Sequence, residues 1–125
     1  MKRILKFRVW DKRETKGERT REMLYDAQNS SLWLDFLVYP EAYELMQYTG
    51  LKDENGEEIY EGDLIQFTCN GVKNVPISVI YHGASFGCVI ETETGSKEYW
   101  DLSYIVRQFY PKVIGNIWEN AELLK

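Results

Sequence analysis

Apolar and basic residues alternate near the start of the chain. Residues 5–10 have the two-residue period of a half-buried β-strand. One face carries apolar side chains and the other carries basic ones and a tryptophan, namely Leu5, Phe7 and Val9 against Lys6, Arg8 and Trp10. Residues 11–22 are polar and include Gly17, so they predict the tip of a long hairpin, with residues 23–25 returning as a short partner strand.

From residue 48 onward, short apolar runs recur at about ten-residue spacing between glycine-containing turns. The runs predict strands at residues 59–60, 64–68, 75–82, 86–92, 98–100 and 113–118. Asp101 can cap a short helical turn through Ile105, and Asn120 can cap another at the end of the chain.

The segment between residues 26 and 44 is the least predictable. Residues 32–39 are nearly all apolar, so they fit a buried strand and a short helix equally well. Pro40 followed by Glu41 is typical of a helix start, because proline suits the first turn and an acid favours its positive end.

The strand spacing indicates a mainly β fold, either a small barrel or a pair of packed sheets. A helical turn before the last strand is also found in SH3-like barrels, so by analogy we expect a small SH3-like barrel with an N-terminal β-strand or hairpin extension and short helical turns. We expect a single domain, residues 1–125, with an N-terminal arm and connection at 1–44 and the barrel at 45–125. One interior should collect the apolar side chains of Val9, Ile65, Val79, Ile90 and Ile117.

The composition and charge narrow the class of protein. Of the 125 residues, 44% are hydrophobic and none of the apolar runs approaches the ~20 residues that span a bilayer, which predicts a folded, cytoplasmic protein. Residues 1–22 carry a net charge of +5 and the remainder −10, giving −5 overall. An acidic body repels phosphate, so only the basic arm keeps a local contact with nucleic acid open.

The sequence shows no catalytic constellation, and we expect no catalytic residue, metal site or cofactor. His82 is the only histidine, and a nucleophile pair with Cys69 or Cys88 lacks a visible third group to orient the base. The two cysteines form no C-x-x-C pair, so reduced thiols are favoured over a disulfide. The acidic stretch around Gly56 fails as a calcium loop, because its first and last ligand positions would fall on leucine and glycine.

Four residues are predicted to shape turns and not to take part in catalysis or metal binding. Asn55 and Gly56 both tolerate positive φ, Gly62 permits a left-handed backbone, and the Asp63 carboxylate can accept N–H groups of a turn. We therefore predict structural roles for Asn55, Gly56, Gly62 and Asp63.

Several stretches resemble the YopX-like proteins of phages and prophages, namely residues 6–11, 45–53, 55–56, 59–63, 85–87 and 113–120. Residues 26–44 match no pattern of that family, and Ala121 replaces a proline usual in its tail. The resemblance implies a phage or prophage product in a bacterial host cell, with an SH3-like barrel. It implies no activity, because the family is one of unknown function.

Three hypotheses about function remain. The first is a non-enzymatic protein-binding or self-assembling module, because a small domain this rich in tyrosine and tryptophan exposes some of them beside charges. The alternative is a nucleic-acid-associated protein that uses the basic arm for phosphate contacts and base stacking. The third is a hydrolase around His82 and the acidic hairpin near Gly56. The residues expected to contact a protein or nucleic-acid partner are Arg3, Lys6, Arg8, Trp10 and Arg13.

Overall fold

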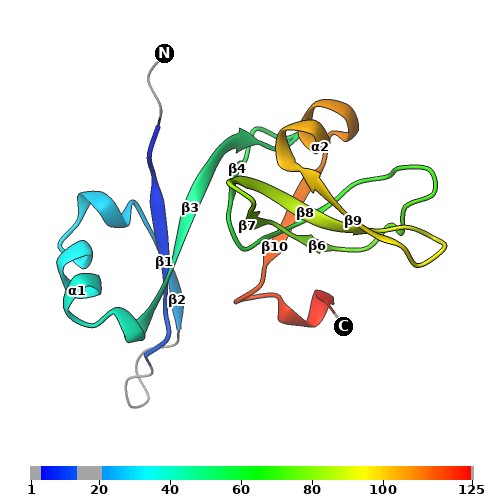
Figure 1. Cartoon of the computed structure of the whole chain (residues 1–125). Coiled ribbons are helices and arrows are strands. Elements are labelled where there is room, and N and C mark those ends of the chain that lie inside the picture. Colours follow the sequence, from blue (N-terminus) through cyan, green and yellow to red (C-terminus); the bar gives the residue numbers. More distant parts are fainter. Residues whose placement is uncertain (1–3, 14–20, 125) are drawn as a thin grey trace. The chain divides into compact units, whose positions relative to one another are not determined.

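The computed structural model describes residues 4–13 and 21–124, and the chain forms two compact units, Met1–Tyr48 and Thr49–Lys125. The fold is mainly β, and its paired strands are antiparallel (Figure 1). The strands are β1 (Phe7–Asp11), β2 (Glu22–Tyr25), β3 (Tyr43–Lys52), β4 (Glu58–Tyr60), β5 (Asp63–Gln66), β6 (Ile77–Ser78), β7 (Ile80–His82), β8 (Ser85–Glu91), β9 (Lys97–Asp101) and β10 (Lys112–Asn116). The helices are α1 (Leu32–Val38) and α2 (Leu102–Phe109), with 3-10 turns η1 (Ala27–Asn29), η2 (Pro40–Ala42) and η3 (Ala121–Leu124). Within these described ranges, none of the helices is long and apolar enough to cross a membrane.

The N-terminal unit is built on the predicted hairpin. Strand β1 lies between β2 and β3, and Val9 is opposite Leu24 on one side and Leu45 on the other. The return of residues 23–25 as a partner strand is confirmed. Strand β3 then continues beyond the unit and joins β4.

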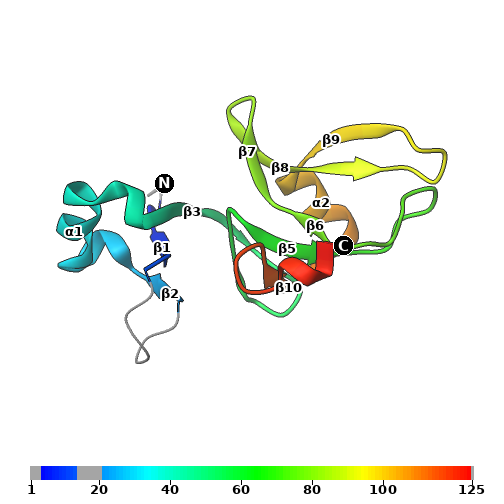
Figure 2. The same cartoon turned by 90° about the horizontal axis from the view of Figure 1, so that it is seen from below.

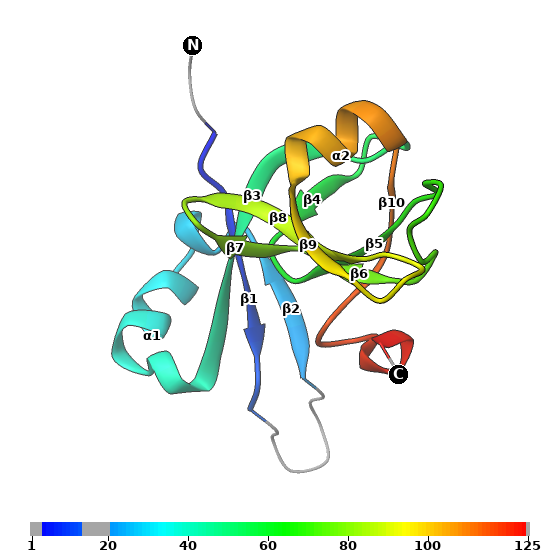
Figure 3. The same cartoon turned by 45° about the vertical axis from the view of Figure 1, so that its right-hand side comes forward.

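The apolar residues 32–38 form helix α1, which lies against one face of this sheet (Figure 3). Trp33 contacts the rings of Phe7 and Phe36, each with a centroid distance of 5.6 Å. Val9, Ala27 and Tyr43 are buried beneath these rings. Phe7 and Val9 therefore supply this core, as the two-residue period predicts. Leu5, expected on the same face, lies outside the strand and is exposed, and the opposite face with Arg8 and Trp10 is buried as well, so the strand is not half-buried.

The C-terminal unit contains two three-stranded sheets. In one, β5 lies between β10 and β6; in the other, β8 lies between β7 and β9. Both sheets contribute to one apolar core, and α2 packs onto it (Figure 2). The buried residues of this core are Ile59, Ile65, Phe67, Val72, Ile77, Val79, Cys88, Ile90, Leu102 and Ile105.

The expectation of one interior is wrong. Val9 belongs to the core of the N-terminal unit, whereas Ile65, Val79 and Ile90 belong to the core of the C-terminal unit. Ile117 is only partly buried. The physical reason is that α1 gives the β1 hairpin an apolar face of its own to pack against.

The predicted strand at 75–82 is two strands in different sheets. Val79 separates them: its N–H donates to the Asp63 carbonyl and its carbonyl accepts the Gly62 N–H, both at 2.8 Å. Before this point the chain pairs with β5, and after it with β8. The apolar alternation continues through the change of sheet, so periodicity alone could not show it.

Helix α2 begins as predicted and runs further than predicted. The Asp101 carboxylate accepts the Ser103 N–H at 3.1 Å, which caps the helix, and Leu102 and Ile105 anchor its buried face. The other predicted helical turn is confirmed as η3 at Ala121–Leu124. Asn120 precedes η3, but its side-chain oxygen accepts the Asn116 N–H at 3.1 Å and thus closes a turn behind β10.

Candidate functional site

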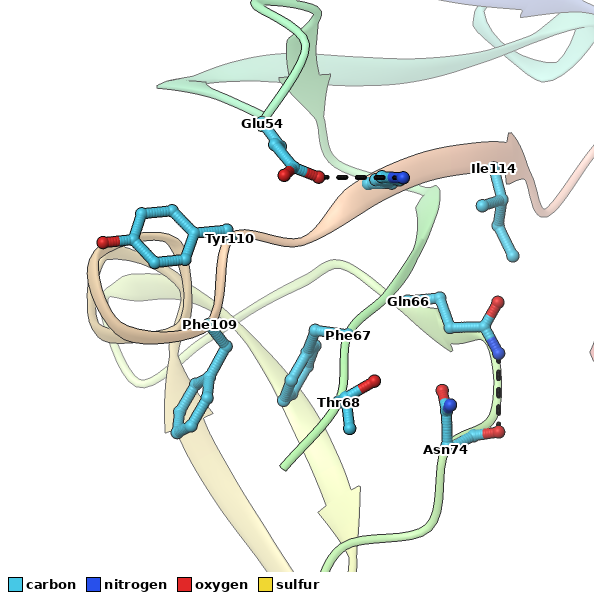
Figure 4. Close-up of a pocket in the computed structure, with 9 residues that line it drawn as sticks. Glu54, Gln66, Phe67, Thr68, Asn74, Phe109, Tyr110 and Ile114 are labelled. Carbon is cyan, nitrogen blue, oxygen red and sulfur yellow. Dashed lines mark hydrogen bonds and ion pairs between the residues drawn. The ribbon is translucent and has the colours of Figure 1, made fainter. Parts of the chain in front are cut away.

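A groove of about 490 Å³ lies in the C-terminal unit, beside the end of α2, the start of β10 and the segment that follows β5 (Figure 4). Its lining residues are Glu54, Gln66, Phe67, Thr68, Asn74, Phe109, Tyr110, Lys112 and Ile114. These side chains come from segments far apart in sequence, so only the folded unit presents them together.

Stacked aromatic rings form one wall of the groove. Phe67 and Phe109 stack with a centroid distance of 5.3 Å and an interplanar angle of 25°, and Trp100 stacks on Phe109 at 5.7 Å. Tyr104 meets Trp100 and Phe109 edge-on. Because each ring is fixed by its neighbours, the wall is preorganised before any ligand arrives.

Tyr110 lines one end of the groove, where its ring points away from Gln66 and Asn74 (Figure 4), and it has an unfavourable backbone conformation. It follows α2 with φ 50° and ψ 62°, in the left-handed region where glycine is preferred. The residue is 66% exposed, and none of the hydrogen bonds found among the described residues involves its hydroxyl. Neither burial nor hydrogen bonding within the molecule explains a tyrosine at this position.

Apart from Ile114, the remaining lining is polar with balanced charge. The Gln66 side-chain amide donates to the Asn74 carbonyl at 3.4 Å, and Thr68 and Asn74 are exposed. Lys112 and Glu54 form an ion pair at 3.8 Å across the rim. Amide and hydroxyl groups beside an aromatic wall can hydrogen-bond the backbone of an extended chain while the rings contact its apolar side chains.

The predicted contact residues lie in the N-terminal unit, except that Arg3 is outside the described residues. The Lys6 ammonium lies 5.5 Å from the centre of the Tyr48 ring. Arg8 is buried, and its guanidinium lies over the Tyr25 ring at 5.8 Å. Trp10 is also buried.

Arg13 belongs to a network of charges in the same unit. Its Nε and one terminal nitrogen each lie 3.2 Å from a carboxylate oxygen of Asp11, and it also pairs with Asp35 at 3.2 Å. The Tyr43 hydroxyl donates to Asp35 and accepts from Arg13. Burial and the bond to Asp35 raise the pKa of Tyr43 to about 12. Two carboxylates therefore already compensate the charge of Arg13.

The residues considered for nucleophilic chemistry are dispersed or buried. Cys88 is fully buried, and burial raises the pKa of its thiol to about 12, so it stays protonated at neutral pH. The His82 ring contacts the Tyr99 ring at 5.4 Å. The Ser85 hydroxyl lies 3.1 Å from the Tyr99 hydroxyl. Within residues 4–13 and 21–124, no group of three His, Cys, Asp or Glu side chains is arranged to hold a metal.

Asp53 joins a turn to the last strand. One carboxylate oxygen accepts the N–H groups of Asn55 and Glu57, both at 2.8 Å, and the other accepts the Val113 N–H at 2.9 Å. Three N–H groups thus converge on one buried carboxylate, which fixes the turn and covers part of the open edge of β10.

Comparison with known proteins shows the family to which the chain belongs. A family model described as YopX protein matches residues 6–125. The chain belongs to the YopX family. The present structure is similar to the crystal structure of protein EF1440 from Enterococcus faecalis, with a TM-score of 0.54 and 26% sequence identity. The match covers 98% of this chain and 99% of the EF1440 chain. No curated protein matches the chain.

The stretches that resemble YopX proteins contain residues that shape the backbone. Gly56 and Gly62 have φ values of 81° and 89°, and Asn55 precedes Gly56 without a positive φ of its own. The Asp63 carboxylate accepts the Tyr60 N–H at 2.7 Å. The Asn116 side chain accepts N–H groups from the two residues that follow Ile117, at 3.0 and 2.8 Å. In this YopX protein the stretches at 55–56, 59–63 and 113–120 contain turns and those at 6–11, 45–53 and 85–87 lie mainly in strands, whereas most groove residues lie outside them.

Sequence reasoning did not identify the groove. A general surplus of tyrosine and tryptophan predicts some exposed rings, but it does not single out Tyr110. The only local signal is the following Pro111, which marks the end of a helix.

Proposed function

We propose that this YopX protein is a phage- or prophage-encoded, non-enzymatic binding module that holds an extended segment of a partner protein in the groove beside Tyr110. In this proposal the curled sheets of the C-terminal unit serve as a small SH3-like barrel that presents the groove. The observation that carries the proposal is the exposed Tyr110 in a left-handed backbone.

The argument rests on the cost of that conformation. A non-glycine residue in the left-handed region costs about 1 kcal/mol relative to glycine. Such strain persists where a side chain serves a function, and Tyr110 lies beside a preformed aromatic wall. A tyrosine ring in this place can contact a partner at little cost in side-chain entropy.

A peptide-display selection against the full chain tests this proposal. Enriched peptides should lose at least tenfold in affinity to Tyr110→Ala, measured by fluorescence anisotropy, and should bind Tyr81→Ala within twofold of wild type. Tyr81 is the matched control, because it is a similarly exposed tyrosine of the same unit that does not line the groove. Equal binding to wild type and Tyr110→Ala would exclude the groove.

A second substitution separates binding from folding. Tyr110→Gly removes the ring and relieves the left-handed backbone, so it should weaken peptide binding at least tenfold while raising the free energy of unfolding by about 1 kcal/mol. A tyrosine with a merely structural role would give the opposite result, namely a less stable protein.

Association with nucleic acid through the basic arm is the alternative proposal. It is supported by the charge of residues 1–22 and by Lys6, while the pairing of Arg13 with Asp11 and Asp35 weakens it. Binding of single-stranded DNA or RNA should then fall steeply between 50 and 200 mM salt. Binding that persists in a Lys6→Glu, Arg8→Glu variant would exclude the arm as the contact.

A further inference from the structure

Helix α1 has a second apolar face that no described residue covers. Leu34, Leu37 and Val38, together with Tyr39 directly after the helix, are between 52% and 67% exposed. Positions 34, 37 and 38 are three and four residues apart, so they share one side of the helix. We define these four residues as the α1 patch.

The α1 patch carries no charge. The inward side of the helix places Leu32, Trp33 and Phe36 on the core of the N-terminal unit. Asp35, the one charged residue of α1, is held by Arg13 and Tyr43. A partner that covers the patch would therefore remove water from apolar surface only, and no ionised side chain of the helix would lose its hydration.

The charge distribution favours a second copy of the chain as the occupant. Residues 1–48 carry nine basic and eight acidic side chains, a net +1, whereas residues 49–125 carry six basic and twelve acidic ones, a net −6. A two-fold contact brings identical charges together, so it is least opposed in the nearly neutral N-terminal unit. An uncharged apolar patch is also complementary to itself, whereas a foreign partner would find no charge there to select it.

The size of the patch sets the strength of the contact. At roughly 150–200 Å² for a fully exposed large side chain, the four residues expose about 400 Å² in each copy. A standard interface buries ~800 Å² per partner, so this patch corresponds to a weak, concentration-dependent dimer. The exposed surface is also at the size where patches on monomers are often functional.

We infer that the α1 patch is a self-association surface through which two copies pair about a two-fold axis. This inference is independent of the groove, which lies in the other unit. Because the contact is apolar, the association should persist at high salt, whereas an association between the basic residues 1–22 and the acidic remainder of another copy would weaken.

Sedimentation velocity from 10 to 500 μM tests the inference. Wild type should shift from monomer towards dimer, Leu37→Glu should raise the dissociation constant at least tenfold, and Val89→Glu should leave it unchanged. Val89 is the matched control, an exposed apolar residue of the C-terminal unit. A wild-type monomer at 500 μM, or equal association of Leu37→Glu and wild type, would overturn it. Far-ultraviolet circular dichroism checks that each variant is folded.

Cross-linking tests the same contact without a substitution that is designed to weaken the dimer. In a Cys69→Ser background, where the remaining Cys88 is buried, Leu37→Cys should be joined into dimers by a short bismaleimide. Its dimer yield should exceed that of Val89→Cys at least fivefold at the same concentration. Equal yields from the two positions would exclude pairing through α1.

Discussion

The two compact units differ in what holds them together. The described core of the N-terminal unit has three buried members, Val9, Ala27 and Tyr43, whereas that of the C-terminal unit has ten. The smaller core is supplemented by rings around Trp33 and by the network of Arg13. The N-terminal unit, in which Trp10, Met46 and Tyr48 are also buried, therefore combines apolar burial with polar and aromatic contacts, whereas the C-terminal unit depends mainly on apolar burial.

The units also differ in how closely the sequence specifies the backbone. In the C-terminal unit, Asp53, Asp63 and Asn116 each bind N–H groups of a neighbouring turn. In the N-terminal unit, α1 begins without a side-chain cap, and its apolar residues face two ways. The comparison teaches that the stretches resembling YopX proteins contain the side chains that fix the backbone of turns. The groove beside Tyr110 and the α1 patch, which are the surfaces proposed for binding, lie largely outside those stretches.

The largest effect is expected from removing the Asp53 carboxylate, which accepts three backbone N–H groups and so fixes the turn that follows it. Asp53→Ala leaves the N–H groups of Asn55, Glu57 and Val113 without their acceptor in a buried position. We expect the free energy of unfolding to fall by about 4 kcal/mol, since charge-assisted bonds and unsatisfied donors are both costly. Urea denaturation measures the loss. Glu54→Ala is the control, because its exposed ion pair should contribute less than about 1 kcal/mol.

The next test compares the two cores directly. Ile90→Ala should cost about 3 kcal/mol and Val9→Ala about 2 kcal/mol, because each leaves a cavity in a fully buried site. Hydrogen exchange should show the Ile90→Ala effect across β5 and β8, and the Val9→Ala effect across β1 to β3. If Val9→Ala raised exchange equally in β5 and β8, the two cores would form one cooperative unit.

Much of the C-terminal unit follows from the sequence because its turns are chemically explicit. Gly62 and Asp63 mark a turn, and Asp101 marks the start of α2. The change of sheet at Val79 could not be predicted, since the alternation of apolar residues continues through it. The pattern reports which side chains are buried and does not report which strand they pair with.

The N-terminal unit was harder to predict for a related reason. Helix α1 is apolar on both sides, so residues 32–39 lack the one-sided period that distinguishes a helix from a strand. The left-handed backbone of Tyr110 could not be predicted, because tyrosine is not a residue type that favours this conformation. Both proposed binding surfaces therefore lie where local sequence rules are broken, which is where functional residues are expected.

Alkaline pH should weaken the N-terminal unit through Tyr43. Its folded-state pKa of about 12 lies above the ordinary value of 10, so its contribution is complete below pH 10 and is lost as the pH rises through 12. At neutral pH, Tyr43→Phe should cost about 1 kcal/mol through the lost bond to Asp35. The difference between wild type and variant in thermal unfolding should shrink between pH 10 and 12. A constant difference across that range would show that Tyr43 does not titrate with unfolding.

The smallest expected effect comes from replacing Ala84, which has a left-handed backbone in a turn away from the groove. This substitution distinguishes an effect of backbone strain from an effect of the Tyr110 ring. Ala84 has φ 66° in the turn between β7 and β8, so Ala84→Gly should raise the free energy of unfolding by about 1 kcal/mol, as Tyr110→Gly should. Ala121→Gly, at an exposed site in η3, should not stabilise the protein. Unlike Tyr110→Gly, Ala84→Gly should leave affinity for a groove-binding peptide within twofold. Loss of binding in both glycine variants would mean that the groove responds to backbone flexibility, and the role assigned to the Tyr110 ring would be wrong.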